Sequence, residues 1–505
     1  MIEAPYVPPF EDSAEPAPLG PLDEVVFAHW KRRGITPSRL CSDGVFIRRA
    51  SLDLIGTLPT AREARDFILD RNPAKRRELV DRLLLRDEYA DYWAMRWGDV
   101  LRIKAEFPIN LWPAAAQAYH RWVRAAMRDN MPLDRFARAL LASSGSNFRV
   151  PPVNFYRAVQ NRDPRTLAQA AALVFMGARA DRWPKARLDG MAAFFAQVGY
   201  KKTLEWKEEI VFHDPARPAG ALKGVKPTYP DGTVPAISPG TDPRAVFAAW
   251  LLAPGNPWFA RAMVNRVWFW MFGRGIVHEA DDIRPDNKPA VPELLSWLEK
   301  DFVAGKYDQK RLLRTIATSA VYQMSPIPRG DEKVAQAVFA SYPVRRLEAE
   351  VLIDALNQIT GSTESYSSQI PEPFTFVPES QRTIALGDGS ITSAFLEMFG
   401  RPARDTGLLS ERNNAPTAAQ RLHMINSSHI QRKLQQSRNL RAMTRLGLAP
   451  REGIVSMYLT CLSRFPTDDE LAAAVQYVRR VGPGRDPGMD VAWALVNSSE
   501  FLLRH

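Results

Sequence analysis

Helix-start signals recur along the whole chain and constrain its fold more than any other feature. Thr60 is followed by Glu63, and Thr467 by Glu470, and each pair forms a capping box ahead of an apolar helical run. Asp242, directly before a proline, supplies a further helix start. Regular alternation of apolar and polar residues, which is typical of half-buried strands, is scarce. The sequence therefore predicts a mainly α, multi-helical protein.

The chain is long enough to need more than one domain. Its 505 residues exceed what one compact core usually holds. Residues 211–240 are rich in proline and glycine and have no helical period, so we expect an irregular connection there, in which short β-strands can occur. This connection divides the chain into a flexible leader (1–21), a helical domain (22–210) and a second helical domain (241–505).

The composition narrows the classes of partner. The formal net charge of +11 is compatible with attraction to nucleic acid, an anionic glycan or an anionic surface. The basic residues are spread without a run of five or six, so a solvated arginine-rich surface is the favoured interpretation and nucleic acid is not expected. No apolar run reaches 18 residues, which predicts no transmembrane span. The acidic, proline-rich start shows no signal peptide in the sequence as given.

Cysteine and histidine usage gives no metal signature. Cys41 and Cys461 are the only two cysteines, and neither belongs to a Cys-x-x-Cys pair. This argues against a metal site or a disulfide framework and favours two buried free thiols. His423 and His429 are six residues apart, which is not the spacing of one helix face. We therefore expect neither a metal nor a cofactor.

A first candidate site lies in the segment VFIRRASLDLIGTLPT, which carries Arg48, Arg49 and Asp53. Arg49 and Asp53 are four residues apart, so they can pair on one helix face. The functional interpretation is an anion-binding arginine. The structural interpretation, which we favour, is an ion pair that fixes this helix against its neighbour.

A second candidate site is the aromatic segment FARAMVNRVWFWMFGRGIV, which contains Asn265, Arg266 and Trp268. Aromatic rings beside an arginine can stack on sugars or bases. Aromatic residues at helical spacing are more often part of a core, and we favour that interpretation.

A third candidate site follows in HEADDIRPDNKPAVPELLSWL. Asp281 and Asp282, with His278 nearby, could act as acid and base or gather a cation. The spacing fits no EF-hand loop, and no HExxH, GxSxG or Walker A pattern occurs in the chain. The alternative, which we favour, is that Asp282 and Arg284 order a loop through charge-assisted hydrogen bonds.

Several blocks of the chain resemble a bacterial family of two domains. Two N-terminal blocks resemble the planctomycete cytochrome-like domain (domain of unknown function 1549): DGVFIRRASLDLIGTLPTAREARDFI and RRELVDRLLLRDEYADYWAMRWGDVLR. Later blocks resemble its usual partner, the planctomycete-specific domain (domain of unknown function 1553): NPWFARAMVNRVWFWMFGRGIVHEADDIRPDNK, YDQKRLLRTIATSAVYQMS, FLEMFGRPAR and WALVNSSEFLLRH. The ordered blocks cover nearly the whole chain from about residue 22 to 505, which makes the resemblance specific.

The resemblance also identifies what this chain lacks. Many relatives carry a haem-type Cys-x-x-Cys-His in a longer version of the linker that here runs from Gly177 through Ala180 to Trp183. Some relatives carry a second cysteine element after the FGRP block, where this chain reads LLSER from Leu408. A c-type haem needs two thiols and an adjacent histidine, so covalent haem is excluded here. If the two elements form one redox or metal site in relatives, Ala180 and Leu409 should lie close together.

The resemblance implies exported proteins, periplasmic or extracellular, of bacteria rich in secreted sulfatases. We expect first a non-haem helical scaffold or binding protein of the bacterial cell envelope, acting with a sulfatase-like partner protein and with anionic polysaccharide as a further candidate ligand. The alternative is a hydrolase with Asp281 and Asp282 as acid–base groups and Arg48, Asn265 and Arg266 orienting the substrate. A second alternative is an electron-transfer accessory protein for a partner cytochrome. Whether the chain is an enzyme stays open, and we favour that it is not one on its own.

Overall fold

Helices dominate the computed structural model, as the sequence predicts. The structure describes residues 16–218, 220–445, 450–481 and 486–505, so most of the expected leader lies outside the described residues. Both capping boxes form, with Thr60 at the start of α3 (Ala61–Leu69) and Thr467 at the start of α21 (Asp468–Arg480). Asp242 caps α10 (Pro243–Leu251) by accepting a main-chain N–H. Residues two or three positions apart in the sequence thus fix these helix starts.

The segment that precedes the predicted connection is built from helices of 8 to 16 residues with short 3-10 turns between some of them. The α-helices are α1 (Pro21–Arg33), α2 (Asp43–Ile55), α3, α4 (Lys75–Leu83), α5 (Asp87–Val100), α6 (Pro113–Arg128), α7 (Leu133–Ala142), α8 (Pro164–Met176) and α9 (Lys185–Ala192). The 3-10 turns are η1 (Pro151–Tyr156), η2 (Ala180–Arg182) and η3 (Ala193–Phe195).

The segment that follows the connection is also helical. Its α-helices are α10, α11 (Phe259–Phe272), α12 (Pro292–Ala304), α13 (Gln309–Ala317), α14 (Glu332–Ala337), α15 (Ala349–Thr360), α16 (Ala394–Met398), α17 (Ala418–Asn426), α18 (Ser428–Gln435), α19 (Arg438–Arg445), α20 (Pro450–Leu462), α21, α22 (Pro487–Val496) and α23 (Ser499–Leu502). Two 3-10 turns, η5 (Thr383–Ala385) and η6 (Leu409–Glu411), lie in its irregular parts.

Short antiparallel strands are present, largely outside the connection where we expected them. The strands β1 (Gly145–Ser146), β3 (Glu209–His213) and β2 (Val198–Lys202) form one sheet in that spatial order. The strands β4 (Arg345–Arg346) and β5 (Leu503–Arg504) form a second, with Arg345 opposite Arg504. Of the described part of 211–240, only the start belongs to a strand, and η4 (Gly220–Leu222) interrupts the remaining loop.

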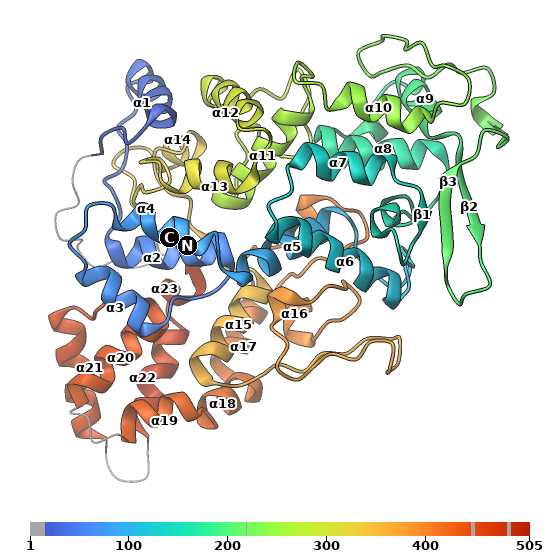
Figure 1. The fold of residues 1–505 in the computed structure, drawn as a ribbon. Coiled ribbons are helices and arrows are strands. Elements are labelled where there is room, and N and C mark those ends of the chain that lie inside the picture. The colour runs from blue at the N-terminus through green and yellow to red at the C-terminus, as the bar shows by residue number, and fades with distance from the viewer. Residues whose placement is uncertain (1–15, 219, 446–449, 482–485) are drawn as a thin grey trace.

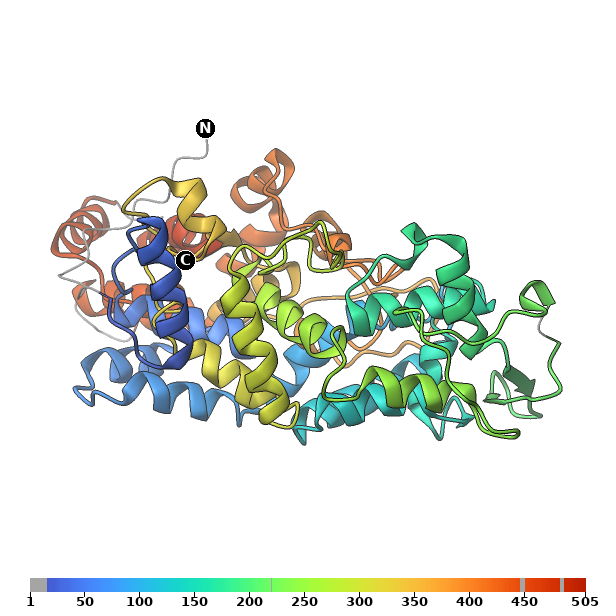
Figure 2. The same cartoon turned by 90° about the horizontal axis from the view of Figure 1, so that it is seen from above.

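Residues from both predicted helical domains join one continuous hydrophobic core. Figure 1 shows the early helices α2 to α4 beside the late helices α20 to α23, while the β2–β3 hairpin lies at the opposite side. Figure 2 shows the same elongated body from above. No helix in the described segments is long and apolar enough to cross a membrane. Helices from the early and the late part of the described chain therefore pack together. This places the first candidate arginines against the last helices.

Candidate functional site

Arg48 and Arg49 of α2 are buried, and both donate hydrogen bonds to main-chain carbonyls of distant segments. Arg48 donates to the main-chain carbonyl of Cys461 at 2.8 Å and of Phe501 at 2.9 Å, which are near the ends of α20 and α23. Arg49 donates to the carbonyl of His505 at 3.0 Å. Helix C-termini leave carbonyls without partners, and a cation there is stabilising. These two arginines therefore hold the C-terminal segment to α2. Cys461 itself is a buried free thiol, as is the other cysteine.

Asp53 takes partners other than Arg49, contrary to what the helical spacing suggested. Its Oδ1 accepts from Arg345 at 2.8 Å and from Arg504, which is fully buried. Its Oδ2 accepts the hydroxyl protons of Tyr322 and Tyr342, both at 2.8 Å. Each carboxylate oxygen of Asp53 is thus satisfied by distant segments. The predicted pairing with Arg49 is wrong, and the ion pairs of Asp53 are with Arg345 and Arg504.

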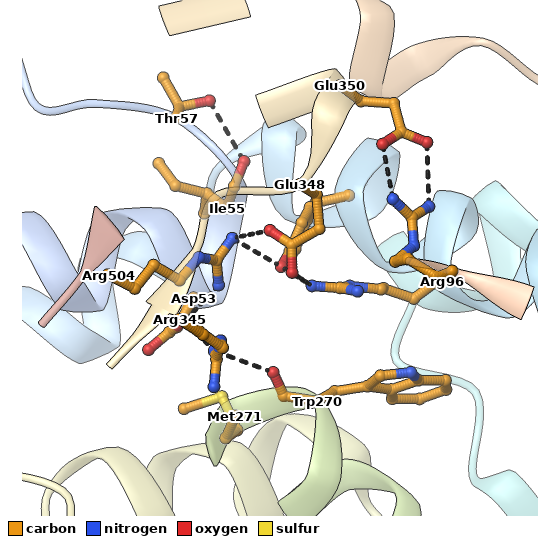
Figure 3. Close-up of polar contacts among 12 residues, drawn as sticks. Asp53, Ile55, Thr57, Arg96, Trp270, Met271, Arg345, Glu348, Glu350 and Arg504 are labelled. Carbon is orange, nitrogen blue, oxygen red and sulfur yellow. Dashed lines mark hydrogen bonds and ion pairs between the residues drawn. The ribbon is translucent and has the colours of Figure 1, made fainter. Parts of the chain in front are cut away.

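The network extends from Asp53 into the middle of the molecule. Figure 3 shows Arg504 between Asp53 and Glu348, with Arg96 on the other side of Glu348. Burial alone would raise the pKa of Glu348, but the charges of Arg504 and Arg96 outweigh it and hold that pKa below its usual range. A neighbouring carboxylate, Glu350, accepts two hydrogen bonds from Arg412, at 2.6 and 2.9 Å. Alternating buried charges therefore connect β5, α5 and the start of α15.

Helix α11 carries Asn265, Arg266 and Trp268, all buried. Arg266 donates to the carbonyl of Leu173 at 2.8 Å, in the last turn of α8. Asn265 accepts the main-chain N–H of Val277 at 2.8 Å and so fixes the loop that follows the helix. Trp268 stacks on the phenylalanine one turn later, with ring centroids 4.3 Å apart. This arrangement agrees with the core interpretation, because none of these side chains is exposed to a sugar or a base.

Asp281 and Asp282 face different partners. The Oδ2 of Asp281 accepts the main-chain N–H of Leu409 at 2.6 Å, and its Oδ1 lies 3.6 Å from Arg266. Burial raises the pKa of Asp281, and the charge of Arg266 only partly offsets this. Asp282 pairs with Arg182 at 3.0 Å and with a second arginine, the one at position 284, at 3.2 Å. Each carboxylate is thus held by at least one arginine.

The predicted site residues therefore fall into separate clusters. Arg48, Arg49 and Asp53 contact the C-terminal segment, whereas Asp281 contacts Arg266 and the loop at residue 409. Asp282 and Arg284 form the loop-ordering pair that the sequence favoured. The convergence of aspartates and arginines that the hydrolase hypothesis requires is not formed by these groups.

A structural role for Asp281 gives a direct prediction. We expect Asp281→Ala to lower the free energy of unfolding by about 1–3 kcal/mol, because the N–H of Leu409 and the Arg266 guanidinium lose a buried acceptor. Chemical denaturation measures the change. The matched control is Asp282→Ala, whose arginine partners are exposed, so we expect a change below about 1 kcal/mol. If Asp281→Ala were as stable as wild type, the structural role would be wrong and Asp281 would return as an acid–base candidate.

The two segments where relatives carry cysteine elements do meet in this fold. Ala178 and Ala180 of the short linker line the same cavity as Leu408, and this cavity has a volume of about 330 Å³. Leu409 is tied by its N–H to Asp281. This adjacency is what one shared site in relatives would require. In this chain the alanine and leucine side chains at these positions supply no ligand atoms, and the two carboxylates that also line the cavity are paired with Arg179 and Lys104.

His423 and His429 also come into contact. Their ring nitrogens lie 3.3 Å apart, because α17 ends and α18 begins between them. His429 pairs with Glu364 at 3.0 Å, and Lys433 lies 3.1 Å from the same carboxylate. The carboxylate of Glu364 therefore already has a positive charge, the ammonium group of Lys433, beside it. A metal site would need a neutral or anionic ligand in that position.

An exposed aromatic group, which the sequence analysis missed, lies near the β2–β3 hairpin. Trp112 before α6 meets Trp206 at 6.4 Å and Phe374 at 5.5 Å between ring centroids. Lys207 places its Nζ 4.8 Å from the Trp112 ring and 5.2 Å from the Trp206 ring. Trp206 is 67% exposed and Phe374 46%. We call Trp112, Trp206, Phe374 and Lys207 the aromatic platform.

The hairpin that carries Trp206 is closed by side-chain hydrogen bonds and contains three lysines and three glutamates. Thr203 and Glu208 close its turn through a side-chain hydrogen bond of 2.8 Å, and Ser146 donates to the same glutamate at 2.5 Å. Lys201 and Lys202, on the strand just before the turn, are exposed. The available signal was a tryptophan between two charged residues in a turn, since a large apolar side chain in such a position is not explained by a core.

Two protein-family models match the chain, one in each half. The family model PSCyt2, described as a protein of unknown function (DUF1549), matches residues 21–198. The family model PSD1, described as a protein of unknown function (DUF1553), matches residues 243–478. Neither the curated proteins nor the solved structures contain a significant match.

Proposed function

Because the chain belongs to the family that joins a PSCyt2 domain to a PSD1 domain, we propose that it is a non-haem helical binding protein of the bacterial cell envelope, whose aromatic platform binds anionic polysaccharide. The arginine-linked helical body acts as the scaffold that holds the platform. The observation that carries this proposal is a cluster of three rings from separate segments, two of them exposed, with one lysine over two of the rings.

The chemistry of the platform suits a charged sugar. The faces of aromatic rings carry a partial negative charge, which attracts the weakly positive C–H groups on a sugar ring. Lys207, Lys201 and Lys202 provide positive charge for a carboxylate or sulfate group on the same polymer. Of the three glutamates in the hairpin, Glu205 is exposed, whereas Glu208 accepts from two hydroxyl groups and Glu209 pairs with two arginines. The exposed side chains of the hairpin thus carry more positive than negative charge, which favours an anionic polymer over a neutral one.

The alternatives have less support. A hydrolase needs carboxylates that face a substrate, whereas Asp281 is buried and both predicted aspartates have arginine partners. Electron transfer needs a haem from a partner, since this sequence has no thiol pair for covalent haem. The periplasmic or extracellular location and the sulfatase-like partner protein rest on the resemblance alone, and cell fractionation tests the location.

Affinity electrophoresis with dextran sulfate and its neutral parent dextran tests the proposal. At about 0.15 M salt, which screens long-range attraction, we expect wild type to be retarded by dextran sulfate and not by dextran. Trp206→Ala should bind roughly tenfold more weakly, as expected for a lost stacking contact of about 1.4 kcal/mol. Trp206→Phe, which keeps a ring, should retain most of the affinity.

A control separates the platform from the overall basic charge. Lys207→Ala should weaken binding, whereas Lys31→Ala, an exposed lysine on α1 at the opposite side of the molecule (Figure 1), should not. Equal retardation by dextran and dextran sulfate, or equal loss in both lysine variants, would contradict the proposal.

A further inference from the structure

Arg102 is a buried cation for which the described residues supply no ion pair. It follows α5, is 4% exposed, and donates its Nε proton to the carbonyl of Ala158 at 2.5 Å. Its Nη1 lies 3.5 Å from the carbonyl of Thr406, and its Nη2 has no hydrogen-bond partner. Burial lowers the pKa of Arg102 to about 10, so the group is still charged at neutral pH. An unpaired buried charge is unfavourable, and a bound anion would relieve it.

Arg102 lines the cavity of about 330 Å³ described above. Two carboxylates also line it, but Asp181 pairs with Arg179 at 3.1 Å and Asp405 pairs with Lys104 at 2.6 Å. Their charges are thus already compensated within the protein. The carboxylate of Glu411 also influences Arg102 from beyond ion-pair distance, while it accepts main-chain N–H bonds from residues 405 and 406.

The rest of the wall is rich in neutral hydrogen-bonding groups. Gln160, Asn161, Gln169 and two threonines, Thr166 among them, border the same space. Amide and hydroxyl groups can both donate to and accept from the hydroxyls of a sugar. One uncompensated cation beside several neutral donors and acceptors matches a ligand with one negative charge and several hydroxyl groups.

We propose that this cavity binds a sugar that carries one anionic group, a uronate or a sugar sulfate ester, with the negative charge paired to Arg102. A single hexose ring fits a space of this volume. The site is separate from the aromatic platform, so it goes beyond the proposed function and can fail without affecting it. Bound at this position, the ligand would contact the linker around Ala180 and the loop at Leu408 together.

Isothermal titration calorimetry with D-glucuronate, glucose 6-sulfate and glucose tests the site. We expect wild type to bind at least one of the two anions and to bind glucose at least tenfold more weakly. Arg102→Met should abolish anion binding. Because Arg102 is buried, Ala180→Leu provides a second variant, which fills the cavity and leaves the arginine in place. Ala304→Leu, at an exposed position on α12, is the matched control and should bind as wild type.

The outcomes are distinct. Loss of anion binding in Ala180→Leu, with circular dichroism and thermal unfolding unchanged, supports the cavity as the site, and binding of D-glucuronate or of the sulfate ester alone identifies the anionic group. Absence of binding by both anions up to about 10 mM, an affinity too weak for a built site, would overturn the inference. Equal binding of glucose, or undiminished anion binding in Ala180→Leu, would overturn it too. Trp206→Ala should not change these titrations, and Ala180→Leu should not change retardation by dextran sulfate.

Discussion

Replacing Arg504 with alanine is expected to lower the free energy of unfolding by about 3–5 kcal/mol, because it leaves two buried carboxylates short of a partner. Arg504 is fully buried and pairs with both Asp53 and Glu348. Asp53 keeps Arg345, and Glu348 keeps Arg96, so the loss should not exceed that of one broken buried network. Urea denaturation followed by circular dichroism measures the change.

The control for this variant is Arg62→Ala. Arg62 pairs with Asp66 at 3.5 Å, and both side chains are largely exposed, so we expect a change within about 0.5 kcal/mol. A loss for Arg504→Ala as small as that of Arg62→Ala would mean that the network does not hold the C-terminal strand to the rest of the fold.

Acidification from pH 7 to pH 5 is expected to destabilise the protein through two buried histidines. Burial lowers the pKa of His120 to about 3 and that of His505 to about 4, whereas the unfolded value is 6.5. The folded state therefore binds fewer protons than the unfolded state below pH 6.5. Their contribution is present above pH 6.5 and is lost as the pH falls toward the folded values. By pH 5 each histidine should account for a loss of about 2 kcal/mol.

Comparison with a variant isolates this effect from the aspartates whose pKa is raised by burial, such as Asp281, which act in the opposite direction. His505→Gln keeps the main-chain carbonyl that Arg49 binds but removes the titrating ring. Between pH 7 and pH 5 it should lose about 2 kcal/mol less than wild type, as measured by denaturation at each pH. Equal losses in the two proteins would contradict the burial of an uncharged His505. The charges of Arg48 and Arg49 also disfavour the protonated form of this ring.

The sequence predicts the helical fold well because helix starts are local. Thr60 and Thr467 cap their helices through residues three positions away. Asp53 shows the limit of local reasoning, since its arginine partners lie 292 and 451 positions further along the chain. Helical spacing suggested Arg49 instead, because pairs within one helix are the only ones that spacing can indicate.

The candidate sites show the same division. The dense aromatic segment around Trp268 is core, as its helical spacing favoured, because stacking inside α11 is a short-range matter. Trp206, Trp112 and Phe374 come from three irregular segments, and no periodicity relates them. The resemblance, in contrast, predicted that Ala180 lies near the loop at Leu409, and the shared cavity agrees with this.

Titration of dextran sulfate into wild type, Trp206→Ala and Asp282→Asn decides whether the aromatic platform is the site of recognition. We expect Trp206→Ala to bind roughly tenfold more weakly, while Asp282→Asn, altered at a residue that only orders a loop through Arg182 and Arg284, should bind as wild type. Full affinity in Trp206→Ala would rule out the platform as the binding site, and a loss confined to Asp282→Asn would place recognition at the aspartates instead.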